Sequence, residues 1–180
     1  MSTWIALLRG INVGGNNLLP MKDLTAVLEE IGCSNVKTYI QSGNAVFDSS
    51  ASNAPQLAKT IGKAVLGSHE FEPLVQVLTI RELEIAVASN PFPNAEANPK
   101  SLHLSFLAEE PGSPELDSLN ELKVESETWA LIGNVFYLHA PDGIGHSKLA
   151  ARAEKLIGVD ATGRNWRTVS KLLEIAKRHD

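Results

Sequence analysis

Arginine, glycine and asparagine stand together in LRGINVGGNN, residues 8–17. Glycines allow backbone amides to turn toward an anion, arginine binds oxyanions through two parallel hydrogen bonds, and asparagine amides donate further ones. The residues that would contact an anion here are Arg9, Asn12, Gly14, Gly15 and Asn17. The glycine spacing matches no nucleotide-binding motif, and glycine and asparagine also populate ordinary left-handed turns. The stretch therefore predicts either an anion-binding loop or a structural turn.

A second polar stretch, IQSGN at residues 40–44, lies between two strand-like runs. Gly43 supplies the positive φ of a hairpin turn, and the remaining polar groups belong to Gln41, Ser42 and Asn44. These groups could satisfy the backbone of the turn itself, or they could orient a ligand by hydrogen bonds. The stretch contains neither a general base nor an activated nucleophile.

Two stretches near the carboxyl end, PDGIGHSKLAAR and ATGRNWRTVSKL, combine helix starts with cations. Ser147 has the type and place of an N-cap, so free amides at the helix start would coincide with Lys148. Arg164 and Asn165 follow a short way on. This pattern predicts an anion site; alternatively, Lys148 lies on a solvated helix face and Trp166 belongs to the core.

No pattern in the sequence indicates a metal site or a catalytic centre. His139 and His146 flank Asp142 without the spacing of a metal motif. As proton-transfer groups, His146, Asp142 and Ser42 each lack a partner at a diagnostic spacing, so we assign no catalytic residue. The single cysteine, Cys33, follows an amphipathic segment, and we expect a buried structural role for it. The sequence names no cofactor and leaves the oligomeric state open.

Composition favours a globular protein that carries net negative charge. The 180 residues are 43% hydrophobic and 21% charged, which is close to the average of folded domains. No apolar run approaches the ~20 residues of a membrane span, and the amino terminus lacks the basic start of a secretory signal, so we expect a cytoplasmic protein. The net charge of −5 makes nucleic-acid binding unlikely by sequence. From residue 143 onward, however, lysine and arginine outnumber aspartate and glutamate by eight to four.

The hydrophobic pattern predicts an α+β fold made of two ferredoxin-like (α-β plait) subdomains. Residues 1–88 show the order βαββαβ, with helices over residues 21–31 and from Asn53 onward. Thr79 and Glu82 have the spacing of a capping box, which predicts a further short helix after the last strand. Residues 89–100 hold three prolines and three asparagines, which is typical of a linker. Residues 101–180 repeat the order and add a terminal helix from Trp166; within them we expect a strand over 124–132 and a hairpin turn at Gly133-Asn134.

The motifs LLRGINVGG, TYIQSGN and T-x-RNW-x-T-x-x-KL resemble those of a bacterial family known as domain of unknown function number 1697. The resemblance covers nearly the whole chain and implies a two-part α+β protein, with no established activity. It places Arg9, Gln41, Ser147, Lys148 and Arg164 among the motif residues. Leu18 stands where the family pattern has a basic residue, which removes one charge from the predicted pocket.

Three functions are compatible with these patterns. The leading hypothesis is that the protein binds a small anionic ligand, such as a nucleotide or a phosphorylated metabolite. The three polar stretches would hold this ligand in a cleft between the two halves. Single-stranded RNA binding ranks lower, because aromatic residues make up only 6% of the chain and the RNP1 pattern is missing. The third is a structural or interaction role in which the polar motifs only form internal hydrogen bonds.

Overall fold

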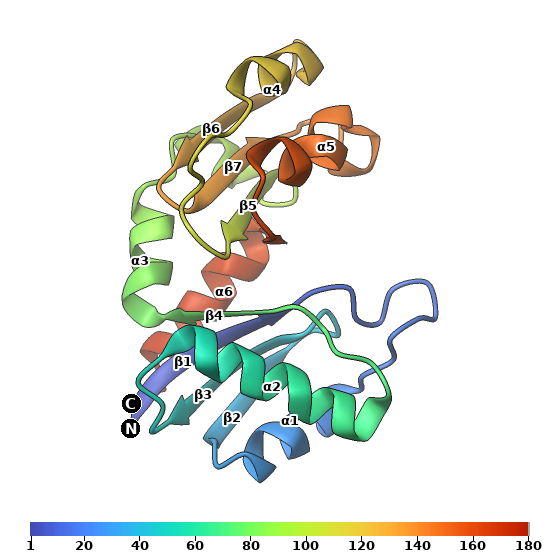
Figure 1. Cartoon of the computed structure of the whole chain (residues 1–180). Helices are drawn as coiled ribbons and strands as arrows, with labels where there is room; N and C mark the ends of the chain where they lie inside the picture. The colour runs from blue at the N-terminus through green and yellow to red at the C-terminus, as the bar shows by residue number, and fades with distance from the viewer. Residues whose placement is uncertain (180) are drawn as a thin grey trace. The chain divides into compact units, whose positions relative to one another are not determined.

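Two compact units, each built on a four-stranded antiparallel sheet, make up the chain (Figure 1). The computed structural model describes residues 1–179. The first unit comprises Met1–Ile85 and the chain from Ser170 onward, and the second comprises Ala86–Val169.

The α+β class is confirmed, and the predicted order of strands and helices recurs in both units. The division falls just before the predicted linker and places the end of the terminal helix with the first unit. No helix of the described part is long and apolar enough to cross a membrane.

In the first unit the strand order is β2-β3-β1-β4, with β1 at the centre because it pairs with both β3 and β4. Its elements are β1 (Ser2–Leu8), α1 (Met21–Glu30), β2 (Ser34–Tyr39), β3 (Asn44–Ser49), α2 (Ala54–His69), β4 (Val75–Thr79) and the start of α3 (Ile80–Ala88).

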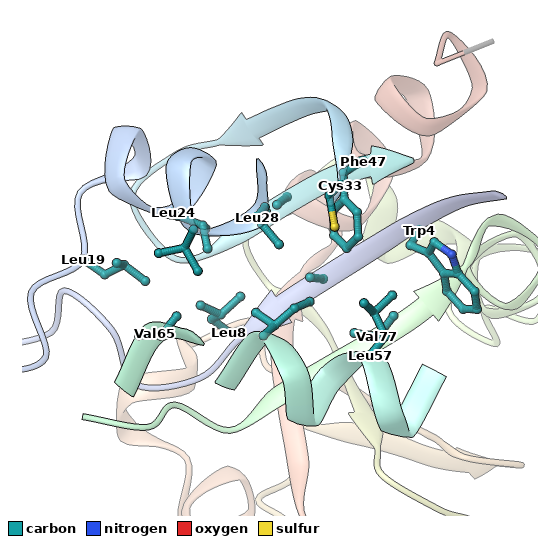
Figure 2. Close-up of a cluster of buried hydrophobic side chains, with 14 of the residues drawn as sticks. Trp4, Leu8, Leu19, Leu24, Leu28, Cys33, Phe47, Leu57, Val65 and Val77 are labelled. Carbon is teal, nitrogen blue, oxygen red and sulfur yellow. The ribbon is translucent and has the colours of Figure 1, made fainter. Parts of the chain in front are cut away.

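The core of this unit lies between the sheet and the helices α1 and α2. Figure 2 shows Leu24 and Leu28 of α1 gathered with Leu8 and Phe47 of the sheet, all of them buried. Cys33 lies in the same cluster, and burial raises the pKa of its thiol despite a hydrogen bond with Ser49. The expected structural role of Cys33 is confirmed, since a buried thiol with a raised pKa is a poor nucleophile.

Local signals in the sequence place the helix boundaries of the first unit. Asn53 accepts a hydrogen bond from the amide of Gln56 (2.8 Å) and so caps α2. Thr79 and Glu82 form the predicted capping box, in which each side chain binds the other residue's backbone amide (3.1 and 2.7 Å). Gly32 takes a φ of +87° just past the end of α1, as a left-handed C-terminal residue does.

The second unit repeats this arrangement with the order β6-β7-β5-β8. Its elements are η1 (Pro93–Ala97), β5 (Leu102–Leu107), α4 (Leu116–Leu122), β6 (Thr128–Ile132), β7 (Val135–His139), η2 (Ile144–His146), α5 (Lys148–Ile157), β8 (Ala161–Asn165) and the start of α6 (Trp166–Lys177). Leu119 of α4 and Leu149 of α5 cover one face of the sheet over Phe136 and Leu138. The predicted hairpin at Gly133-Asn134 is confirmed by the pairing of Ile132 with Val135.

The predicted strand over residues 124–132 was too long. Residues 124–127 form a turn, in which the amide of Glu127 donates to the carbonyl of Val124 (3.0 Å). The Glu127 carboxylate accepts from the amide of Val124 (3.2 Å), and the residue is 4% exposed. A side chain that satisfies the turn's own backbone competes with strand pairing, so the strand begins only at Thr128.

Candidate functional site

The first polar stretch forms the loop between β1 and α1, which Figure 1 shows in blue. Asn12 organises this loop with a φ of +54°. Its Nδ2 donates to the carbonyls of Leu19 (2.9 Å) and Gln41 (2.7 Å), and its Oδ1 accepts from the amide of Leu19 (2.8 Å). The Asn12 amide is thus used internally, and it joins the first polar stretch to the second.

The glycines of this loop build a small hairpin. Val13 and Asn16 form an isolated bridge, and Gly14 and Gly15 between them have φ of +58° and +79°. Positive φ at both central positions is what a type I′ turn requires. Asn17 closes the loop, because its backbone carbonyl accepts from the amide of Asn12 (3.1 Å) and its Nδ2 donates to the carbonyl of Gly10 (3.1 Å). Ligand contact by these residues stays a prediction beside this structural role.

The second polar stretch is the turn between β2 and β3. Asn44 is fully buried, and its Nδ2 donates to the carbonyl of Tyr39 (3.0 Å) and to the Ser42 hydroxyl (2.9 Å). Gly43 is buried with a φ of +79°, and a Cβ there would lie 2.7 Å from Cδ1 of Ile11. Gln41 is exposed and contributes its carbonyl to Asn12. These polar residues therefore have a structural role, because their hydrogen bonds stabilise a tight turn and join it to the loop.

The two segments that contain this loop and turn carry positive charge. Residues 9–22 and 31–47 contain no aspartate or glutamate, although the whole chain has a net charge of −5. The same two segments contain Arg9, Lys22 and Lys37, and all three are exposed. The backbone amide of Arg9 donates to the carbonyl of Leu74 (2.9 Å), which fixes the start of the loop. We call residues 9–19 together with 40–44 the loop–turn site.

The third polar stretch lies in the second unit, and two of its side chains are helix caps. The Ser147 hydroxyl accepts from the amide of Ala150 (2.9 Å) at the start of α5, as predicted. Asn165 Oδ1 accepts from the amide of Thr168 (3.0 Å) at the start of α6. Lys148 is exposed at the first position of α5. Both caps are thus accounted for by the fold.

Arg164 and Trp166 have different surroundings from Lys148. Arg164 Nη1 donates to the carbonyl of Gly163 (2.8 Å), and burial lowers the pKa of the guanidinium to about 10. A partly desolvated guanidinium attracts an anion more strongly than an exposed one, because the local dielectric constant is lower. Trp166 is 7% exposed and belongs to the core.

The proton-transfer candidates do not gather into a catalytic group. The carboxylate of Asp142 accepts from the Ser126 hydroxyl (2.6 Å), and His146 is exposed in η2. Within residues 1–179, no cluster of three or more histidine, cysteine, aspartate or glutamate side chains could hold a metal ion.

A Ser–His–Asp chain that the sequence pattern did not reveal lies elsewhere in the first unit. The Ser68 hydroxyl is 2.7 Å from His69 Nδ1, and His69 Nε2 is 3.2 Å from the Asp23 carboxylate. The hydroxyl also lies 3.2 Å from the carbonyl of Ala64, which competes for its proton. The group sits at the C-terminal end of α2, where the helix dipole opposes the negative charge of an acyl-transfer intermediate. We therefore assign it to holding α1 against α2. Asp23 and His69 are 46 residues apart in the sequence, so no local spacing of residues could have predicted this contact.

Comparisons with known proteins give a family and a fold. The sequence model of the family described as "Protein of unknown function (DUF1697)" matches residues 1–137. Among solved structures, the conserved bacterial protein SP0830 from Streptococcus pneumoniae is similar, with a TM-score of 0.74 and 22% identity. The similarity covers 97% of this chain and 98% of that one. No curated protein matches.

Proposed function

Since this chain belongs to the DUF1697 family of proteins of unknown function, we propose an activity from its own residues: it binds a small anionic molecule, such as a nucleotide or a phosphorylated metabolite, at the loop–turn site. The observation that carries the proposal is the lack of any carboxylate in residues 9–22 and 31–47 of an otherwise acidic chain. Segments that carry exposed cations and no carboxylate of their own attract anions by Coulomb interaction.

Rigidity of the loop supports the proposal as well. The Asn12 side chain makes hydrogen bonds at 2.7–2.9 Å to the backbone of Leu19 and Gln41, so it fixes both ends of the site. A preformed loop loses little conformational entropy when a ligand binds, and more of the contact energy then appears as affinity.

Arg9 is the residue that we expect to contribute most to binding. It is exposed at the entry of the loop, next to Gly10 and within the carboxylate-free segment. A charge-assisted hydrogen bond to an anion contributes about 1.5–3 kcal/mol, which is roughly a tenfold to 100-fold gain in affinity. The proposal rests on the first unit alone. Of the second unit's predicted contacts, Ser147 and Asn165 serve as caps, and Lys148 is exposed.

The finer fold assignment belongs to the same proposal. We infer that each unit is a ferredoxin-like plait, supported by the orders β2-β3-β1-β4 and β6-β7-β5-β8, in which the first strand of each unit lies between the third and the fourth.

Thermal unfolding in the presence of pyrophosphate, ATP and inorganic phosphate tests the binding. We expect at least one of these anions to raise the unfolding temperature, and R9A to abolish most of the shift. R81A is the matched control, because Arg81 is an exposed arginine of the same unit that lies on α3, outside the site. An equal shift in R9A and the wild type would refute the role of Arg9. The lack of a shift with all three anions, together with no co-purifying anion in native mass spectra, would refute the proposal.

One observation favours a second candidate, in which the polar motifs only stabilise the fold. Asn12, Asn17, Ser42 and Asn44 all have hydrogen bonds within the first unit. On this hypothesis N12A lowers stability and no anion raises the unfolding temperature of the wild type. Under the binding hypothesis an anion raises that temperature and R9A lowers the anion affinity, so these measurements separate the two functions.

A further inference from the structure

A cavity of about 350 Å³ lies in the second unit, in the segment that the sequence predicted as a linker. One wall is the chain from Pro91 to Ser101, which contains the short helix η1, and the other is formed by His139, the last residue of β7, and by Pro141. The volume is within the range of small-molecule sites in proteins, toward its lower end. All lining residues belong to the second unit, so the cavity shares no residue with the loop–turn site.

Hydrogen bonds hold both walls of this cavity in place. The amide of Phe92 donates to Oδ1 of Asn90 (3.0 Å), whose Nδ2 donates to Glu96 (2.8 Å). The walls are joined where the amide of Ala140 donates to the carbonyl of Ser101 (2.8 Å). Proline at positions 91, 93 and 141 fixes φ as well. A stretch that forms neither an α-helix nor a sheet ladder is therefore held in place as one wall of the cavity.

The lining selects for an uncharged molecule. None of the described residues that line the cavity is lysine, arginine, aspartate or glutamate. Phe92 is half-buried and offers an aromatic face, and the prolines add flat apolar surfaces. Such a lining offers no charged side chain to pair with a charged ligand.

Polar groups among the lining residues are few and suit a heteroaromatic ring. Asn94 and Asn98 are exposed and carry amides that donate and accept, and the half-buried His139 adds an imidazole. A small-molecule site typically combines apolar walls with a few polar groups that fix orientation.

We propose that this cavity is a binding site for an uncharged planar ring compound, with Phe92 as the stacking surface and His139, Asn94 and Asn98 as hydrogen-bonding groups. An aromatic ring against Phe92 gains the specific attraction of offset or edge-to-face contacts in addition to its buried area. The site is independent of anion binding and requires no residue of the loop–turn site.

Amide NMR spectra of the full chain test the proposal with three probes: benzamide, indole and adenosine. We expect at least one probe to cause saturable shifts of the Phe92, Ala95, Asn98 and Ser101 amides. The amides of residues 9–19 should not move, so this test succeeds or fails apart from the anion proposal. Unchanged spectra in residues 91–101 with all three probes would overturn it.

Variants at Phe92 give the sharper result. F92A should weaken binding of the active probe about tenfold, and F92L, which keeps an apolar side chain but no ring, about threefold. L116A is the matched control, because Leu116 is an apolar residue of the same unit that is 45% exposed and outside the cavity. Dispersed amide signals of β5 to β8 verify that each variant folds. Wild-type affinity in both Phe92 variants would overturn the proposal.

Discussion

The two units share a hydrogen-bonded frame but differ in the loop that follows their first strand. In both units, the backbone amide of the last residue of the first strand donates to a carbonyl in the hairpin between the second and third strands. The backbone amide of the next residue donates to a carbonyl just before the fourth strand. The equivalent bonds are Leu8 N to Gly43 O (2.8 Å) and Leu107 N to Asn134 O (2.8 Å), then Arg9 N to Leu74 O (2.9 Å) and Ala108 N to Asp160 O (2.9 Å).

The loops built on this common frame carry opposite charges. Residues 9–20 contain Arg9 and no carboxylate, whereas residues 108–115 contain Glu109, Glu110 and Glu115 and no cation. The frame is thus what the fold needs, because both units keep it. The second unit keeps the frame with a loop of opposite charge, so the positive charge of the first loop is not needed for the frame, and this difference directs the search for function to that loop.

Breaking the frame of the first unit at Gly43 should have the largest effect. G43A places a Cβ 2.7 Å from Ile11 Cδ1 and 2.8 Å from Leu8 Cβ, at a φ of +79°. Left-handed strain and overpacking together should lower the free energy of unfolding by about 2–5 kcal/mol.

The equivalent hairpin of the second unit supplies the control for G43A. Gly133 has a φ of +56°, and a Cβ at this position would meet nothing within 4 Å. G133A therefore adds only the backbone strain of about 1–2 kcal/mol. Urea denaturation measures both variants. Equal losses would show that the contact between Gly43 and the loop is unimportant.

Removing the tie between the loop and the turn should have the next largest effect. N12A deletes the bonds to Leu19 and Gln41 and leaves the backbone groups of the buried Leu19 without this partner, which should cost about 1–3 kcal/mol. Asn16 is an exposed asparagine of the same loop, and N16A should stay within about 0.5 kcal/mol of the wild type. Urea denaturation again provides the measurement. A similar loss in both variants would mean that the loop has no specific anchor.

Sequence patterns predicted the frame well because its signals are local. The hairpin at Gly133-Asn134, the cap at Asn53 and the box at Thr79 and Glu82 each depend on residues two to four positions apart. The tie from Asn12 to Gln41 spans 29 residues, and the polar motifs gave no sign of whether they faced a ligand or each other. Residues 89–100, which include most of the wall from Pro91 to Ser101, were predicted as a linker because of their prolines; prolines disfavour an α-helix or a sheet ladder but do not exclude order.

Acid should affect the second unit through His103. Its Nε2 is buried without a hydrogen-bond partner, and burial lowers its pKa, although a backbone hydrogen bond at Lys100 opposes the shift. The folded pKa of His103 lies below the unfolded value of about 6.5. At a pH between these two values, the unfolded state therefore binds more protons than the folded state. Stability is therefore complete above about pH 6.5 and falls as the pH drops toward the folded pKa, by at most about 1.4 kcal/mol for each pH unit.

The variant H103L removes this titration. Its free energy of unfolding, followed by urea denaturation from about pH 7.5 to about pH 5 around the unfolded pKa, should vary less with pH than that of the wild type. H146L is the control, because His146 is an exposed histidine of the same unit. The same pH slope in H103L and the wild type would show that His103 is not the titrating group.

The smallest expected effect is a gain in stability at Ile40, where the first unit departs from the second. The hairpin of the second unit has a positive φ only at Gly133, whereas that of the first unit has one at Gly43 and a second at Ile40, which has a φ of +48° and is 50% exposed. A β-branched residue is strained there and asparagine is not, so I40N should raise the free energy of unfolding by about 0.5–1 kcal/mol. V13N is the control, since Val13 is 65% exposed in the same site without a positive φ; it changes polarity and relieves no strain.

If I40N gains stability and loses anion affinity, the strain is retained for binding. If it loses stability, the side chain makes a contact that outweighs the backbone cost, and the hairpins of the two units differ in packing rather than in strain.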